Sequence, residues 1–163
     1  MADILSRLTT ESDDTKGANE KMPYSYNIDV ETGCVFVKFR GKISKKELND
    51  YINQTYSDPA LPEPVKKLVD ARDVTDVDIH YDDAVISHDI LSQYNEKLEN
   101  CIIAIVAPSD ATYGVSRMLE AINHDIMNIH VFRDINEAMG LLNISRPDYR
   151  RNTLMFPARC NAA

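Results

Sequence analysis

Acidic side chains gather in one short stretch of the sequence, and closely spaced carboxylates can bind a metal ion. The stretch holds five aspartates and one histidine, Asp73, Asp76, Asp78, His80, Asp82 and Asp83. Counted from Asp76, however, the sixth position is Tyr81 and the twelfth is Ser87, where a calcium loop requires Gly and a bidentate Glu. We therefore expect no metal here. The stretch instead predicts a solvated loop with carboxylates near a helix N-terminus, where the helix dipole favours negative charge.

Catalytic signatures are equally weak. His88 falls on the apolar stripe of an expected helix, and His124 with Asp125 is best explained as a helix end, where a cation favours the dipole. No Ser or Cys stands in a G-x-S-x-G nucleophile motif, and the five glycines form no phosphate-binding loop. We expect a protein without enzymatic activity or cofactor. An enzyme of unknown reaction is an alternative.

Two groups of residues are suited to binding because each follows an expected strand. The first group is Asp70, Arg72, Asp73, Asp78 and His80, and the second is Ser109, Asp110, Tyr113 and Arg117. Open α/β sheets bind ligands at the carboxyl ends of their strands, and the free N–H groups of a helix N-terminus favour anions. These nine residues are our candidates for a ligand- or partner-binding site. The alternative is structural, with Arg72 paired to a carboxylate and Tyr113 packed in the core.

Composition limits the class of protein. The 163 residues, 44% of them hydrophobic and 27% charged, suit one globular domain with tails. A net charge of -8 disfavours binding to nucleic acid, whose phosphates it would repel. No apolar run approaches the roughly 18 residues of a membrane-spanning helix. The cysteines at positions 34, 101 and 160 do not form a disulfide framework, and the polar start lacks a signal-peptide segment, so we expect a cytoplasmic protein.

The elements that position these residues follow from hydrophobic spacing. Alternation in residues 24–30 and 34–39, joined by a turn at 31–33, predicts an antiparallel hairpin that ends at Gly41. Further strands are expected at 67–71, 101–106 and 129–132. Helices are expected after a Ser44–Glu47 capping box, from 81 to 98, after residue 110 and after Asp134. The order ββαβαβαβα, with about four helices, predicts an α/β fold with a single mixed sheet and right-handed crossovers.

The expected organisation has three parts. Residues 1–22 are polar and predict a flexible leader, residues 23–143 predict the folded domain, and residues 144–163 predict a flexible basic tail. The exposed edge of the hairpin offers a surface for homodimerisation.

Several segments resemble bacterial SpoIIAA-like, or STAS/SEC14-type, domains. They are residues 24–37, 68–74, 104–108, 113–118 and 131–134. The resemblance spans roughly residues 24–143 and implies a SpoIIAA-like fold. Anti-sigma-factor antagonists of this type are phosphorylated on a hydroxyl just after the third strand. The matching segment here is Asp78-Ile79-His80-Tyr81, which lacks that phospho-acceptor, so we do not expect the phosphorylation switch.

The resulting functional hypothesis is a non-enzymatic regulatory or binding module for an unknown protein partner or a small apolar or anionic ligand. The alternative is a carrier of a lipid-like or other small apolar molecule. A carrier requires the helix stripes with Tyr51, Tyr56, Met118 and Met139 to surround a cavity rather than pack closed.

Overall fold

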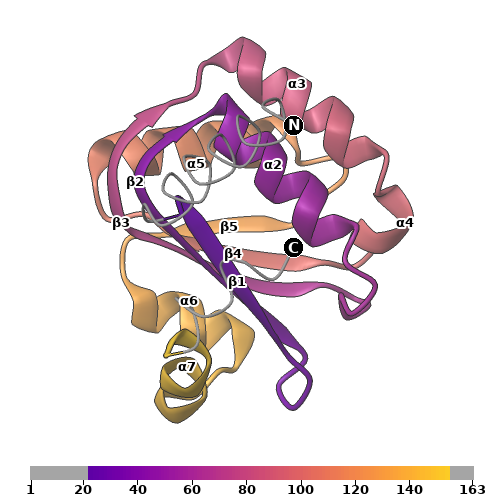
Figure 1. The fold of residues 1–163 in the computed structure, drawn as a ribbon, viewed down its shortest axis with the longest axis vertical. Coiled ribbons are helices and arrows are strands. Elements are labelled where there is room, and N and C mark those ends of the chain that lie inside the picture. The colour runs from indigo at the N-terminus through magenta and orange to yellow at the C-terminus, as the bar shows by residue number, and fades with distance from the viewer. Residues whose placement is uncertain (1–21, 155–163) are drawn as a thin grey trace, which may run out of the picture.

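The computed structural model describes residues 22–154 and contains one five-stranded sheet in the order β1-β2-β3-β4-β5 (Figure 1). The strands are β1 (Tyr24–Asp29), β2 (Cys34–Ser44), β3 (Lys66–Asp78), β4 (Ile102–Val106) and β5 (Ile129–Phe132). β1 and β2 are antiparallel, whereas β2 to β5 pair in parallel. The predicted mixed sheet is therefore confirmed.

Helices cover both faces of the sheet. They are α2 (Lys45–Tyr56), α3 (Tyr81–Ser92), α4 (Asn95–Leu98), α5 (Asp110–Ile122), α6 (Ile135–Leu142) and α7 (Arg146–Thr153). One core cluster joins the sheet to α2, α3 and α5, and a second joins the opposite face to α6. Figure 1 shows α6 and α7 together on the side of the sheet away from α2, α3 and α5.

Strand β3 contributes to both cores because successive side chains in a strand point to opposite faces. Lys67 and Val69 face α2, where Lys67 contacts the ring of Tyr51 and Val69 joins the first cluster. Leu68 joins the second cluster, and Asp70 contacts α7 on the same side. Successive residues of β3 therefore serve two layers. Lys67 and Val69 face α2, whereas Leu68 and Asp70 face α6 and α7.

Local signals at the turn and at two helix starts are confirmed. Gly33 has a φ of +66°, a conformation that glycine adopts without steric cost. The backbone N–H of Ser44 donates to the Glu47 carboxylate at 2.9 Å, as a capping box requires. Asp134 caps α6 by accepting from the N–H of Asn136.

Two strands are longer than predicted. Gly41 does not end β2; it lies within the strand with a φ of +70°, next to an irregularity in the pairing. Beyond it, residues 42–44 pair with residues 76–78 of β3. Asp73, Asp76 and Asp78 therefore lie on a strand, and the prediction of a loop there is wrong. The reason is tertiary, because β2 supplies the backbone partners that make an acidic segment extended.

The predicted helix from residue 81 to 98 is two helices, and α7 was not predicted, so the described residues contain six helices instead of four. The chain turns between Ser92 and Asn95. Tyr81 is 63% exposed and Val85 is also exposed, while Ala84 and Leu91 are buried. The core side of α3 is therefore formed by Ala84, Ser87 and Leu91, while the large side chain of Tyr81 faces solvent.

The prediction of a flexible tail from residue 144 is wrong for residues 144–154. Ile144 and Asn152 are buried, and Ser145 caps α7 by accepting from the N–H of Asp148. This helix contacts the sheet through polar side chains, so a search for apolar spacing does not find it. Residues 1–21 and 155–163, and with them Cys160, lie outside the described residues. Within residues 22–154, no helix has the length and apolar character needed to cross a membrane.

Candidate functional site

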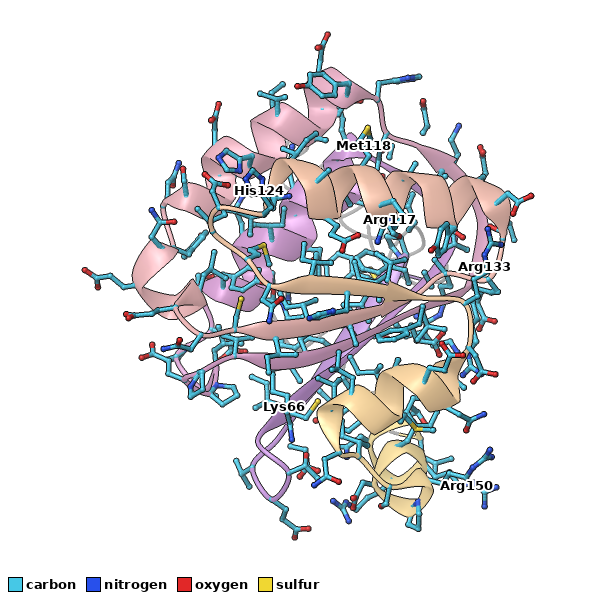
Figure 2. All side chains as sticks on the ribbon, turned by 180° about the vertical axis from the view of Figure 1, so that it is seen from behind. Lys66, Arg117, Met118, His124, Arg133 and Arg150 are labelled. Atoms are coloured by element: carbon cyan, nitrogen blue, oxygen red, sulfur yellow. The ribbon has the colours of Figure 1, made fainter. Side chains whose placement is uncertain are left out.

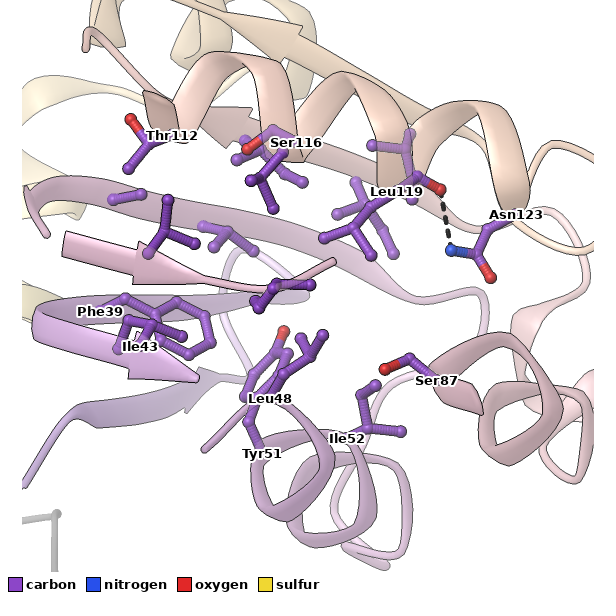
Figure 3. A pocket seen from close by; sticks show the side chains of 18 of the residues that line it. Phe39, Ile43, Leu48, Tyr51, Ile52, Ser87, Thr112, Ser116, Leu119 and Asn123 are labelled. Carbon is purple, nitrogen blue, oxygen red and sulfur yellow. Dashed lines mark hydrogen bonds between the residues drawn. The ribbon is translucent and has the colours of Figure 1, made fainter. Parts of the chain in front are cut away.

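A cavity of about 120 Å³ lies inside the first core, between the sheet and helices α2, α3 and α5 (Figure 3). The sheet side is formed by apolar side chains that include Phe39, Val69 and Ile103, and α2 contributes Tyr51 and Ile52. An engineered apolar cavity of about 150 Å³ can hold benzene. The space therefore suits a small apolar molecule.

Four polar residues also line the cavity, namely Ser87, Thr112, Ser116 and Asn123. Figure 3 shows Thr112, Ser116 and Asn123 in a row along the side of α5 that faces the sheet. Three of the four have partners. Ser87 donates to Asn49 at 2.9 Å, Thr112 hydrogen-bonds Ser109, and Asn123 donates to the Leu119 carbonyl at 2.8 Å. The buried Ser116 hydroxyl has no hydrogen-bond partner among residues 22–154.

Small side chains explain why space remains. Thr112 and Ser116 occupy the buried face of α5, where larger apolar residues would normally fill the gap to the sheet. Ala71 of β3 and Ser87 of α3 are small as well. Because a core does not collapse fully onto small side chains, a void persists between them.

A buried lysine lies beside the cavity. Nζ of Lys67 is 3.9 Å from the ring centroid of Tyr56 and 4.8 Å from that of Tyr51, and both tyrosines line the cavity. Lys67 is fully buried, and Nζ has no hydrogen-bond partner among residues 22–154. Burial lowers the pKa of Lys67 to about 7, because the charged ammonium loses its hydration.

Asp70 and Arg72, from the first group of predicted residues, lie on the opposite face of the sheet, beside α7. The guanidinium of Arg72 donates two hydrogen bonds of 2.9 Å to the buried Asp70 carboxylate. The hydroxyl of Tyr149 in α7 donates to the same carboxylate at 2.7 Å. Lys38 approaches both Asp70, at 3.5 Å, and the exposed Asp73, at 3.0 Å. The predicted structural pairing of Arg72 with a carboxylate is confirmed.

The electrostatics of this group favour the charged pair. Burial raises the pKa of Asp70, but hydrogen bonds from Arg72 and Tyr149 outweigh it, and the pKa of the carboxyl lies below its usual value. The hydrogen bonds to Asp70 raise the pKa of Arg72. Burial, followed by the bond to Asp70, raises the pKa of Tyr149. The Asp70 carboxylate is thus an occupied acceptor rather than a free base.

The second group lies around the start of α5. Ser109 is the N-cap, and Asp110, 94% exposed, pairs with Arg133 at 2.9 Å. The guanidinium of Arg133 lies 4.2 Å from the ring centroid of Tyr113, which is half-buried rather than packed in the core as the structural alternative expected. Arg117 lies on α5 (Figure 2), is 55% exposed and pairs with Glu120 at 2.6 Å.

The remaining two candidates form a third group at the end of β3. Nε2 of His80 lies 3.0 Å from the Asp78 carboxylate, and His80, 80% exposed, is the N-cap of α3. The structure therefore separates the nine candidates into three groups that share no hydrogen bond or ion pair within residues 22–154. In the same range, no group of His, Cys, Asp and Glu side chains is arranged to hold a metal ion.

Of the nine candidates, only Ser109 makes a side-chain hydrogen bond to a residue of the cavity lining within residues 22–154. Its hydroxyl accepts from the N–H of Thr112. The missed residues carry a signal that can be read in the sequence. Thr112, Ser116 and Asn123 recur at helical spacing along α5 and its C-cap, next to Val115 and Leu119, which also line the cavity. Small polar residues on the buried side of a helix indicate space or a polar partner.

Comparisons with known proteins bear on the fold alone. No protein-family model matches the sequence, and no curated protein matches it. One similar solved structure is an uncharacterised protein of the DUF3478 family with a SpoIIAA-like fold from Shewanella loihica PV-4. The two share 13% sequence identity at a TM-score of 0.51, over 76% of this chain and 97% of that one. The chain therefore has a SpoIIAA-like fold, as the resemblance of its sequence segments implied.

Proposed function

We propose that this protein is a non-enzymatic binding module that holds a small apolar molecule with one hydrogen-bonding group. The observation that supports this function is the cavity of about 120 Å³ in the core between the sheet, α2, α3 and α5. Tyr51 and Tyr56, two of the residues that a carrier would need around a cavity, line it. Met118 packs against the same core without lining the cavity, and Met139 belongs to the second core.

The free energy of binding would come from two sources. An apolar molecule in the cavity gains roughly 25 cal/mol for each Å² of apolar surface removed from water, and it restores dispersion contacts that a void lacks. The Ser116 hydroxyl, which has no partner among residues 22–154, supplies a hydrogen bond for a polar group on the ligand. Phenol combines both features and toluene has only the first.

Regulation through a protein partner stays a prediction. The segment after β3 holds Ile79, which is buried, and His80, which caps α3. Neither side chain offers a phosphorylatable hydroxyl. Regulation through this protein would then depend on the bound molecule, not on phosphate at this position.

The test is calorimetric titration of the protein with phenol and toluene. We expect both to bind, phenol more tightly. Ser116→Leu should abolish both affinities because the leucine fills the cavity, while Ala121→Leu, which adds the same side chain to the exposed side of α5, should change neither. Ser116→Ala should weaken phenol binding about fivefold, as expected for one lost hydrogen bond, and leave toluene unaffected. Wild-type protein that binds neither compound would contradict the proposed function.

A further inference from the structure

Strand β1 forms one of the two edges of the sheet. All six of its residues pair with β2 in unbroken register, and no other strand within residues 22–154 pairs with it. Natural sheets protect their edges with short strands, bulges or charged side chains. The opposite edge, β5, is protected in this way because it has only four residues. β1 has neither a bulge nor a charged side chain between Tyr24 and Ile28, so this edge is suited to pairing with a further strand.

The backbone groups of alternate β1 residues point away from the sheet. The N–H of Arg40 donates to the Pro23 carbonyl at 2.8 Å, so these two residues form a hydrogen-bonded pair of the ladder. In an antiparallel ladder such pairs alternate with pairs that exchange no backbone hydrogen bond. Tyr24, Tyr26 and Ile28 belong to the second kind, and their N–H and C=O groups therefore face away from β2. Each of these three residues offers one donor and one acceptor to a partner strand.

Helices cover the two faces of β1 and leave its edge between them. In Figure 1, β1 runs between α2 and α7, and both helices contact it. The ring of Tyr24 packs on the α2 side, whereas Asn27 hydrogen-bonds Asn152 of α7 on the other side. Tyr26 and Ile28 are only partly buried. The middle and the end of the outer edge therefore lie where a second strand can approach.

The two ends of β1 carry opposite charge. At the hairpin end, the carboxylates of Asp29, Glu31 and Asp148 surround the guanidinium of Arg151, so three negative charges share one positive charge. At the other end, the guanidinium of Arg40 donates to the backbone just before the strand. A second copy that runs antiparallel would bring the negative end of each β1 next to the positive end of the other. This complementarity favours a second copy of the chain as the partner.

We propose that two copies of this chain pair through β1, as antiparallel strands related by a two-fold axis at Tyr26. In this register Tyr26 lies opposite Tyr26 of the second copy, and Tyr24 lies opposite Ile28. Each opposed pair exchanges two backbone hydrogen bonds, and any other register pairs fewer of the outward groups. The same surface serves both copies, so the assembly closes as a dimer and the two sheets become continuous.

Residue 26 provides a test that is specific for this register. Light scattering over a concentration series should find a wild-type particle of twice the chain mass. Tyr26→Phe, which removes only the hydroxyl that donates to Asp58, should stay dimeric. Tyr26→Lys and Tyr26→Glu each place two like charges directly opposite at the axis, so each should raise the dimer dissociation constant about tenfold.

Mixing the two charged variants tests the pairing itself. An equimolar mixture should form a heterodimer, because the charges at the axis are then opposite, and this recovery would show that both variants fold. A mixture that stays monomeric, while both variants keep the wild-type circular dichroism, would overturn the register.

Amide hydrogen exchange of the full chain identifies the surface. As the protein concentration rises, exchange of the Tyr24, Tyr26 and Ile28 amides should slow, because the second copy accepts their hydrogen bonds. The amides of Ser25 and Asn27, which already bond to β2, should not change. A wild-type chain that stays monomeric at every concentration would overturn the proposal. A dimer that persists in both charged variants, or that leaves the three outward amides unaffected, would also overturn it, because such a dimer forms through another surface.

Discussion

The hydroxyl of Tyr149 donates to the carboxylate of Asp70 at 2.7 Å and so joins two residues 79 positions apart in the sequence. This bond ties α7 to the centre of the sheet, on the face opposite the cavity. The same carboxylate accepts from the backbone and the guanidinium of Arg72. A carboxylate with this many donors has a structural function, because its lone pairs are already used.

Removal of the Tyr149 hydroxyl should destabilise the fold. Tyr149→Phe leaves a buried charge with one donor fewer, and we expect the free energy of unfolding to fall by about 1–3 kcal/mol, measured by urea denaturation at pH 7. Tyr113→Phe is the control, since the Tyr113 ring contacts Arg133 and its hydroxyl makes no hydrogen bond with the described residues. Equal losses in the two variants would contradict a special contact at Asp70.

The two candidate arginines should respond differently to truncation. Arg72→Ala leaves the buried Asp70 without its main partner, and breaking a buried pair in this way costs about 3 kcal/mol. Arg117→Ala removes a pair with Glu120 on α5 in which the Arg117 side chain is 55% exposed and Glu120 27% exposed, so water can replace part of the contact and the loss should be smaller, about 1 kcal/mol. Thermal and urea unfolding of both variants measure the difference. A stable, well-folded Arg72→Ala protein would revive a binding function for this residue.

Lys67 should make stability depend on pH. The folded state releases the Lys67 proton above about pH 7, whereas the unfolded chain keeps it up to the ordinary pKa of 10.5. The unfolded state thus binds more protons in this window, so the free energy of unfolding rises with pH. Relative to Lys67→Met, wild-type stability should increase between pH 7 and 9 with a slope of up to about 1.4 kcal/mol per pH unit. A difference that stays constant between pH 6.5 and 8.5, measured by urea denaturation, would show that Lys67 keeps its charge in the folded state.

Asn152 should hold α7 to the hairpin. Its side-chain N–H groups donate to the Asp29 carboxylate at 3.0 Å and to the Asp148 carbonyl at 2.8 Å, and the residue is buried. Asn152→Ala removes a donor to a buried charge and should cost about 1–3 kcal/mol. Thr153→Ala, at the next position, should cost less than about 0.5 kcal/mol. Hydrogen exchange of the α7 amides would show whether the loss is local, with faster exchange expected only in Asn152→Ala.

Features set by neighbours in the sequence could be predicted. The turn at Gly33, the capping box at Ser44 and the N-cap at Asp134 each depend on contacts within four residues. The alternation of strands and helices then determines a mixed sheet, because parallel strands need crossover helices.

Features set by distant neighbours could not be predicted. The acidic half of β3 is extended because residues 42–44 pair with it, and α7 is positioned by Asn152 and Tyr149 through acids in β1 and β3. The cavity is even harder to predict from the sequence. It exists because the small side chains of Thr112 and Ser116 leave space between α5 and the sheet, and such a void is a property of the whole packing rather than of one segment.

The alternation along β3 sets a rule for how this protein can change. One residue inserted between Lys67 and Asp70 would shift the register and turn every later side chain to the other layer. With the insertion ahead of Val69, the Asp70 carboxylate and Arg72 would turn together toward the apolar space, and Val69 would face Tyr149 of α7 instead. Insertions at the hairpin turn of residues 31–33 disturb no such order. Length variation among functional descendants of this chain should therefore accumulate at the hairpin tip and be absent from residues 66–71 of β3.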